Sequence, residues 1–211
     1  MRKTLMRSVP TAMLAIVAIA GCKGKDNAAA ADSAKVADTA AMRAPASDTA
    51  AKPATVSNNG WTDAQILAYA SAANTGEIEE ARLASKKAIN PAVKAFARLI
   101  MTDHQTMLND GKNFANQNNI APDTTKGDVT DAMKDSRKTV RDLTDKAAGK
   151  DWDEDYISKQ IDGHKAVLDH LKDAAKSTNN AGLRTMLEKA SGKVQEHLTK
   201  AQDIKEKKLK S

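Results

Sequence analysis

Apolar residues recur at the spacing of an α-helix throughout the part of the chain that follows Trp61. Helix-breaking segments divide this part: "INP", "NNIAPDTTKGD", "AGKD" and "STNNAG". Proline disfavours a helical conformation in the residue before it but suits the first turn of a helix, so Pro91 both ends one helix and begins the next. The pattern predicts a short helix over about 128–148 and four long ones, over about 61–88, 91–117, 153–176 and 181–207.

The predicted helices indicate the fold class. Ala, Leu, Lys, Asp and Gln dominate, and aromatic residues make up only 3% of the chain, which is typical of an all-helical protein. Two hairpins of long helices with a longer connection between them describe a four-helix bundle over residues 61–211. The short helix falls in that connection and allows a crossover of the ferritin-like kind, although simple up-down-up-down order stays open.

Residues 22–60 lack this periodicity. They consist mainly of Ala, Ser, Thr, Asp and Pro, with almost no large apolar side chains. Such a segment cannot bury enough surface to offset the loss of chain entropy on folding. We therefore predict a disordered tether.

The N-terminus has the organisation of an export signal. The basic segment "MRKTLMR" precedes the apolar run "TAMLAIVAIAG", which is shorter than the about 20 residues of a transmembrane helix. We predict a signal peptide over residues 1–21. Cys22 follows it and is the single cysteine of the chain, so an internal disulfide is excluded and this thiol needs another use.

The segment "IAGC" resembles the lipobox of bacterial lipoproteins. This resemblance implies cleavage before Cys22 and acylation of Cys22. In such lipoproteins of Gram-negative bacteria the next residue influences sorting, and Lys23 is not the aspartate that holds them at the inner membrane. We expect a protein of the bacterial cell envelope, lipid-anchored in the outer membrane and facing the periplasm.

The charge of the chain narrows the range of partners. Arg2, Lys3 and Arg7 leave with the signal peptide, which halves the formal net charge of +6. No basic cluster is interleaved with aromatic residues, so nucleic-acid binding is not predicted. The expected partners are the membrane, through the lipid anchor, and either another envelope protein or a second copy of the chain.

Each long helix carries a polar side chain that can bind metal on its otherwise apolar face. These side chains are Glu77, with Glu80 one turn further on, and His104, His164 and His197. The four positions lie at similar distances from the two hairpin turns, so at about 1.5 Å rise per residue they meet near mid-height of the bundle. His170 lies off this stripe and is expected to be exposed.

Two interpretations of this constellation stay open. Imidazoles and carboxylates from facing helices are a usual metal site in bundles, and such a set suits a single ion of Cu, Zn, Fe or Ni. We predict Glu77, Glu80, His104, His164 and His197 as ligands. Asp103 and Gln160 would orient the rings as outer partners. The same cluster could hold another small ligand in place of a metal. Alternatively, Glu77 paired with protonated imidazoles forms a buried polar network that binds nothing, and the protein is a non-catalytic structural or protein-interaction module of the envelope.

Enzymatic activity is not predicted. Diiron bundles use Glu-x-x-His pairs, but the residues three before the site histidines are Met101, Ile161 and Val194, which disfavours a diiron cofactor. The nucleophile motif Gly-x-Ser-x-Gly is absent, and acylation would consume the thiol of Cys22. Met101 and Met107 flank His104 and suit Cu(I), but methionines at helical spacing are also ordinary core residues.

Three segments carry a family resemblance: "GEIEEARLASKKAINPAVKAFARLIMTDH", "DEDYISKQIDGHKAVLDHL" and "EHLTKAQ". They are similar to domain-of-unknown-function family 4142, exported bacterial proteins that have a ferritin-like helical bundle and no settled activity. The resemblance covers about residues 61–207 and supports the fold and the site. Its marks are the Glu77 region, Phe96-Ala97, Asp103-His104, Tyr156, His164 and His197-Leu198. One departure is "DWDEDY", where Trp152-Asp153 replaces the Phe-Asp that is frequent in these proteins.

Overall fold

The computed structural model describes residues 60–209, and within them it is all-helical, without strands. The prediction of an all-α protein is therefore confirmed, and each predicted helix bound lies within three residues of the observed one. The predicted signal peptide, Cys22 and all of the predicted tether except Gly60 lie outside the described residues. The helices are α1 (Asp63–Lys87), α2 (Pro91–Gln117), α3 (Gly127–Asp145), α4 (Lys150–Ser177) and α5 (Ala181–Ile204), which ends in the π-helical turn η1 (Lys205–Leu209).

Capping residues explain where the helices begin. The Thr62 hydroxyl accepts from the backbone N–H of Gln65, whose side chain accepts in turn from the N–H of Thr62, and this capping box starts α1. The side chain of Asn90 caps α2, and Pro91 occupies its first position, where a missing N–H costs nothing. Each cap satisfies backbone N–H groups that a helix end leaves unpaired.

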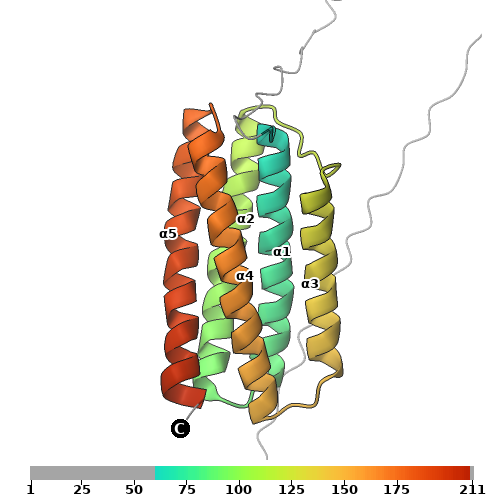
Figure 1. Ribbon diagram of the computed structural model, residues 1–211, viewed down its shortest axis with the longest axis vertical. Coiled ribbons are helices and arrows are strands. Elements are labelled where there is room, and N and C mark those ends of the chain that lie inside the picture. The colour runs from blue at the N-terminus through green and yellow to red at the C-terminus, as the bar shows by residue number, and fades with distance from the viewer. Residues whose placement is uncertain (1–59, 210–211) are drawn as a thin grey trace, which may run out of the picture. The chain divides into compact units, whose positions relative to one another are not determined.

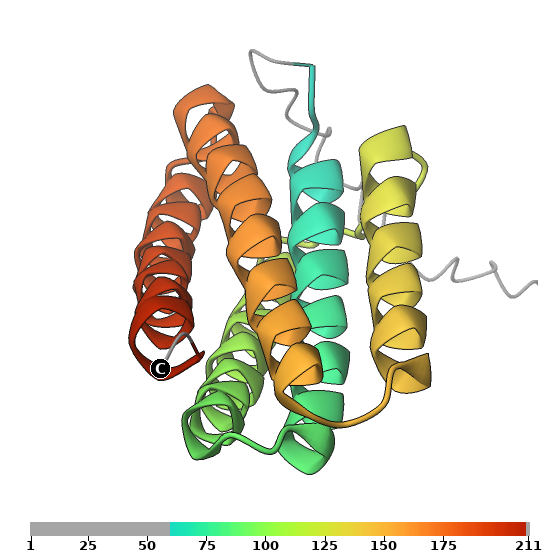
Figure 2. The ribbon, with the colours of Figure 1, turned by 60° about the horizontal axis from the view of Figure 1, so that its bottom comes forward.

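The long helices pack in pairs, α1 against α2 and α4 against α5 (Figure 1). α3 packs against α1 and returns the chain to the end at which α2 began, so α4 runs in the same direction as α2 (Figure 1). The view in Figure 2 shows the same arrangement, with α3 lying on the far side of α1 from α5. The connection between the two helical hairpins is thus a crossover.

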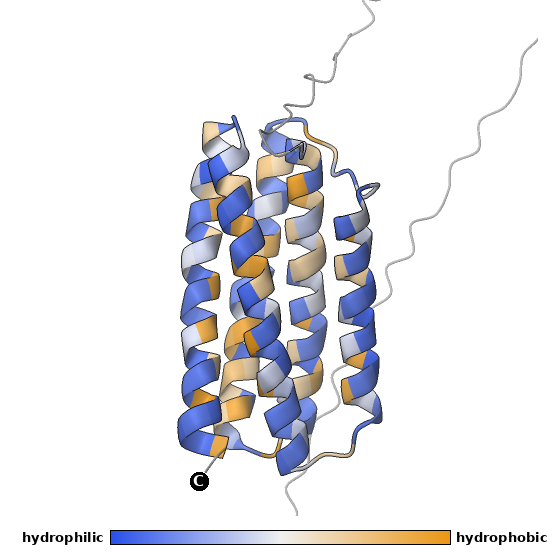
Figure 3. Ribbon diagram, in the orientation of Figure 1, coloured by the Kyte–Doolittle hydropathy of each residue, from blue (hydrophilic) through white to orange (hydrophobic). Residues whose placement is uncertain are grey.

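Residues of high hydropathy, orange in Figure 3, recur along the four long helices, whereas α3 is mostly hydrophilic. Val129 and Leu143 are the buried residues of α3, so this helix adds little to the core. At the start of α4, Trp152 stacks on Tyr156. The neighbouring Asp153 carboxylate accepts a hydrogen bond from the backbone N–H of Asn90 at 2.7 Å. The Asp153 hydrogen bond joins the first turn of α4 to the turn between α1 and α2.

Within residues 60–209 no helix is both long and apolar enough to span a membrane.

Candidate metal centre

Three histidines from three helices meet in the interior. They are His104 on α2, His164 on α4 and His197 on α5, and each is at most 2% exposed. Their ring centroids lie 5.5, 5.2 and 5.4 Å apart, close to an equilateral triangle. One ring nitrogen of each histidine can act as a ligand, and these atoms all lie within 4.8 Å of one another.

The orientation of His104 is fixed by Asn74 on α1. The Asn74 amide nitrogen donates to the carbonyl of Ala70 at 2.8 Å, which leaves its oxygen Oδ1 as the atom facing His104. This oxygen can only accept, so Nδ1 of His104, 2.9 Å away, carries the proton. The other nitrogen, Nε2, therefore holds a lone pair, and it is buried with no hydrogen-bond partner within the described residues.

The other two rings are held in the same way. Nδ1 of His164 donates to the backbone carbonyl of Gln160 at 2.9 Å, and Nε2 of His197 donates to the Asp103 carboxylate at 2.9 Å. Nε2 of His164 and Nδ1 of His197 therefore carry lone pairs, and neither has a partner in the part of the chain that the structure describes. Three buried acceptors thus face one another without a donor between them.

Burial keeps His104 and His197 uncharged. It holds the pKa of His104 well below the ordinary histidine value, and the neighbouring His164 and His197 lower it further. Burial also lowers the pKa of His197, although the hydrogen bond to Asp103 opposes this shift. Both imidazoles are therefore neutral at pH 7, the form in which histidine binds metals.

The spacing of the rings fits a metal ion. An ion bound to three imidazoles at about 2.0–2.1 Å in tetrahedral geometry would hold the ring centroids about 5 Å apart. The observed separations of 5.2–5.5 Å are close to this value. Imidazole nitrogens suit Zn, Cu, Fe and Ni, and the oxygens of Asn74, Gln160 and Asp103 act as the partners that orient ligating rings.

The two predicted glutamate ligands lie on another side of His164. The Gln160 amide donates to Glu77 at 2.7 Å and to Glu80 at 3.2 Å. Oε1 of Glu77 is 3.7 Å from Nδ1 of His164, which is the protonated nitrogen of that ring. Burial, with the charge of Glu77, raises the pKa of Glu80 to about 9, so Glu80 is protonated at pH 7.

The structure thus sorts the predicted residues into two groups. The three histidines form the group whose ligand atoms converge, and Glu77 and Glu80 lie outside that group. Asp103 lies where an outer partner was predicted, whereas Gln160 contacts His164 through its backbone carbonyl. Sequence analysis missed Asn74, although it lies three residues before Glu77, a spacing that places both on one helix face.

His170 lies outside the cluster and is half-buried, not exposed as expected. Its ring centroid lies 3.7 Å from that of Tyr69 and 4.5 Å from that of Trp61. Contact with two aromatic rings explains its burial.

Fold and site together define an all-helical protein with a buried trihistidine cluster. The chain belongs to the family described as Domain of unknown function (DUF4142), whose sequence model matches residues 44–204. The resemblance drawn from the sequence is thereby confirmed. No curated protein and no solved structure matches the chain.

Proposed function

We propose that this protein binds a single transition-metal ion through His104, His164 and His197. The observation that carries this proposal is the set of three buried nitrogen lone pairs that face one another, each on a ring whose other nitrogen is anchored to an oxygen. A buried polar atom without a partner costs about 1–3 kcal/mol, so three at one point need an explanation. A cation supplies what all three lack.

A purely structural network explains these contacts less well. Such a network needs a donor for the three unpaired nitrogens, but no group in the described part of the chain donates to Nε2 of His104, Nε2 of His164 or Nδ1 of His197. The carboxylate of Glu77 approaches His164 only at the nitrogen that already donates to Gln160. The contact of His164 with Glu77 and its hydrogen bond to Gln160 therefore leave the three unpaired ring nitrogens without a donor.

The ligand set favours an ion that accepts three neutral nitrogens. Zn²⁺ binds three protein ligands with a fourth position open in catalytic sites, and Cu ions also take imidazole ligands. Glu77 and Glu80, predicted as direct ligands, become members of a neighbouring polar layer in this proposal. The role proposed is metal binding, with no reaction assigned.

We further propose that the metal site lies in a ferritin-like four-helix bundle on a lipid-anchored envelope protein. The crossover through α3, which runs α4 parallel to α2, supports the ferritin-like arrangement (Figure 1). The signal-peptide pattern and the lipobox-like "IAGC" support anchoring through Cys22 in the outer membrane. The protein's partners there would be the membrane and either another envelope protein or a second copy.

Thermal unfolding with added ions tests the metal site. Zn²⁺, Cu²⁺, Ni²⁺, Co²⁺, Fe²⁺ and Mn²⁺ are added separately to chelator-treated protein, and bound metal per chain is measured by elemental analysis. An ion that binds only the folded state stabilises it by about 2.7 kcal/mol at 100 times its dissociation constant. His164→Ala should abolish this gain.

His170→Ala is the matched control, because it removes a histidine outside the cluster and should keep the gain from the ion. A structural network predicts a different result. His164→Ala would then be destabilised equally in every buffer, and no ion would separate it from the wild type. That outcome would refute the metal site.

A further inference from the structure

A cavity of about 250 Å³ lies beside the histidine cluster, between α1, α2, α4 and α5. His104 and His164 line one end of it, and Leu67, Ala115 and Leu171 line its far part. At 1.5 Å rise per residue, the path along α2 from His104 to Ala115 is about 16 Å long. The cavity is therefore elongated along the helices, and it begins at the rings of His104 and His164, two of the three residues of the metal centre proposed above.

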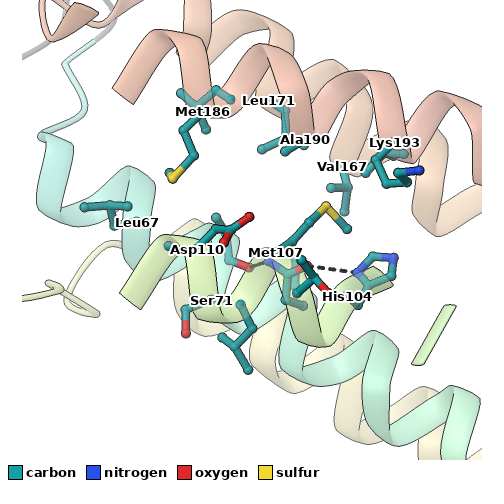
Figure 4. A pocket seen from close by; sticks show the side chains of 18 of the residues that line it. Leu67, Ser71, His104, Met107, Asp110, Val167, Leu171, Met186, Ala190 and Lys193 are labelled. Atoms are coloured by element: carbon teal, nitrogen blue, oxygen red, sulfur yellow. Dashed lines mark hydrogen bonds between the residues drawn. The ribbon is translucent and has the colours of Figure 1, made fainter. Parts of the chain in front are cut away.

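The wall of the cavity is mostly aliphatic. In Figure 4, Met107 on α2 extends toward Val167 on α4, His104 lies beside Met107, and Met186 and Ala190 on α5 lie across the cavity. Apart from His104 and His164, the residues that line it within the described part of the chain carry no aromatic ring. Methionine is flexible and adapts to irregular apolar ligands. These walls suit a flexible aliphatic chain better than a flat ring.

The size of the cavity limits the length of that chain. At about 30 Å³ for each water in the liquid, 250 Å³ corresponds to about eight waters, and a chain of about eight to ten heavy atoms fills a similar space. This volume lies near the lower end of small-molecule pockets. A medium-length aliphatic chain fits.

The charge of a bound metal ion determines which polar head group an aliphatic ligand of this cavity would carry. Three neutral imidazoles leave the full charge of a bound divalent ion uncompensated, and they leave a coordination position open. The nearest carboxylates are already engaged, Asp103 by His197 and Lys193 and Glu77 by Gln160. An incoming carboxylate would supply both an oxygen ligand and a negative charge, whereas an amine would be repelled.

We infer that the cavity binds a medium-chain aliphatic carboxylate, whose head group occupies the open position on the metal and whose chain lies between Met107, Val167, Met186 and Ala190. This inference rests on the proposed metal site. The charged residues that line the cavity are balanced, with Lys112, Lys189 and Lys193 against Glu77, Asp103 and Asp110, so the preference for an anion rests on the metal ion alone.

The test uses Co²⁺-loaded protein, because the visible spectrum of Co²⁺ reports its ligands. Octanoate should change that spectrum and should bind about 100-fold more tightly than butanoate, since four more methylene groups are buried. Octylamine, which has the same chain and the opposite charge, should leave the spectrum unchanged. Ala190→Leu should weaken octanoate binding at least tenfold, while affinity for Co²⁺ and for butanoate stays within twofold of the wild type.

Two further variants guard against a folding defect. Ala70→Leu fills the cavity from α1 and should have the same effect, whereas Ala166→Leu, exposed on α4, should have none. Equal affinity for octanoate and butanoate, or an unchanged Co²⁺ spectrum with octanoate, would overturn the inference and leave the metal site intact. A protein that binds no Co²⁺ and no other ion would contradict the metal site itself, and with it the head-group assignment.

Discussion

Glu80 offers a sharp test of the buried polar layer formed by Glu77, Glu80 and Gln160 beside the histidine cluster. Its side chain is only 7% exposed and accepts a hydrogen bond from Gln160 at 3.2 Å. Burial and the nearby Glu77 raise the pKa of Glu80 from 4.5 to about 9. Glu80→Gln keeps the shape and the neutral state of this side chain but removes its titration.

The sign of the effect follows from proton binding. Between pH 4.5 and about 9 the folded protein holds a proton on Glu80 that the unfolded chain releases. The contribution of Glu80 to the stability of the wild type therefore falls as the pH rises through this range. At 1.36 kcal/mol for each pKa unit, the loss at pH 7 relative to pH 4.5 is about 3 kcal/mol. Glu80→Gln should match the wild type near pH 4.5 and exceed its stability by about this amount at pH 7.

Urea unfolding of the chelator-treated proteins, followed by circular dichroism at a series of pH values from 5 to 9, measures this difference. Glu79→Gln is the matched control, because Glu79 is the exposed neighbour on the same helix and its substitution should not produce a growing difference. Parallel stability curves for Glu80→Gln and the wild type would show that Glu80 is ionised in the folded protein. The reasoning about the polar layer would then be wrong.

Three other predictions concern the site and the anchor. Asp103→Asn should weaken Co²⁺ binding about 10–100-fold in a spectroscopic titration, because the partner of His197 loses its charge; unchanged affinity would exclude an orienting role. Below about pH 6.5 the metal-free wild type should lose stability relative to His104→Gln, because the pKa of His104 is lowered in the folded protein and the unfolded chain therefore binds more protons. His104→Gln should flatten that part of the curve, and an unaltered slope would contradict it. Cys22→Ser should abolish incorporation of a labelled fatty acid in bacteria, and labelling equal to that of the wild type would rule out acylation at Cys22.

The positions of the histidines could be predicted from the sequence because two simple measurements suffice. Helix stops such as "INP" fix where each hairpin turns, and the number of residues from the turn fixes the height of a side chain. The apolar stripe then fixes the inward face. Counting from the turn in this way places His164 and His197 at similar heights, and in the structure their ring centroids lie 5.4 Å apart.

The roles of the α1 side chains could not be predicted in this way. A helix stripe shows which face is inward but not which neighbouring helix a given residue contacts. On α1, Asn74 contacts His104 on α2, whereas Glu77, nearly one turn later, contacts Gln160 on α4. Side chains of a helix also lean toward its N-terminus, so equal height along antiparallel helices does not ensure contact.

The alanines around the cavity argue that this part of the bundle is not built for stability alone. Ala70, Ala73 and Ala190 line the cavity at positions where a larger apolar side chain would fill space and bury more surface. Each added methylene that is buried contributes about 0.8 kcal/mol, so the small residues forgo several kcal/mol of core packing. Near the other end of the bundle, Trp152 and Tyr156 fill the interior completely, and both are 0% exposed. The same fold therefore can close its core near Trp152, and it leaves a cavity beside His104 and His164. A bundle with a purely structural polar network would gain by filling that space, whereas a bundle that admits a ligand to a metal must keep it.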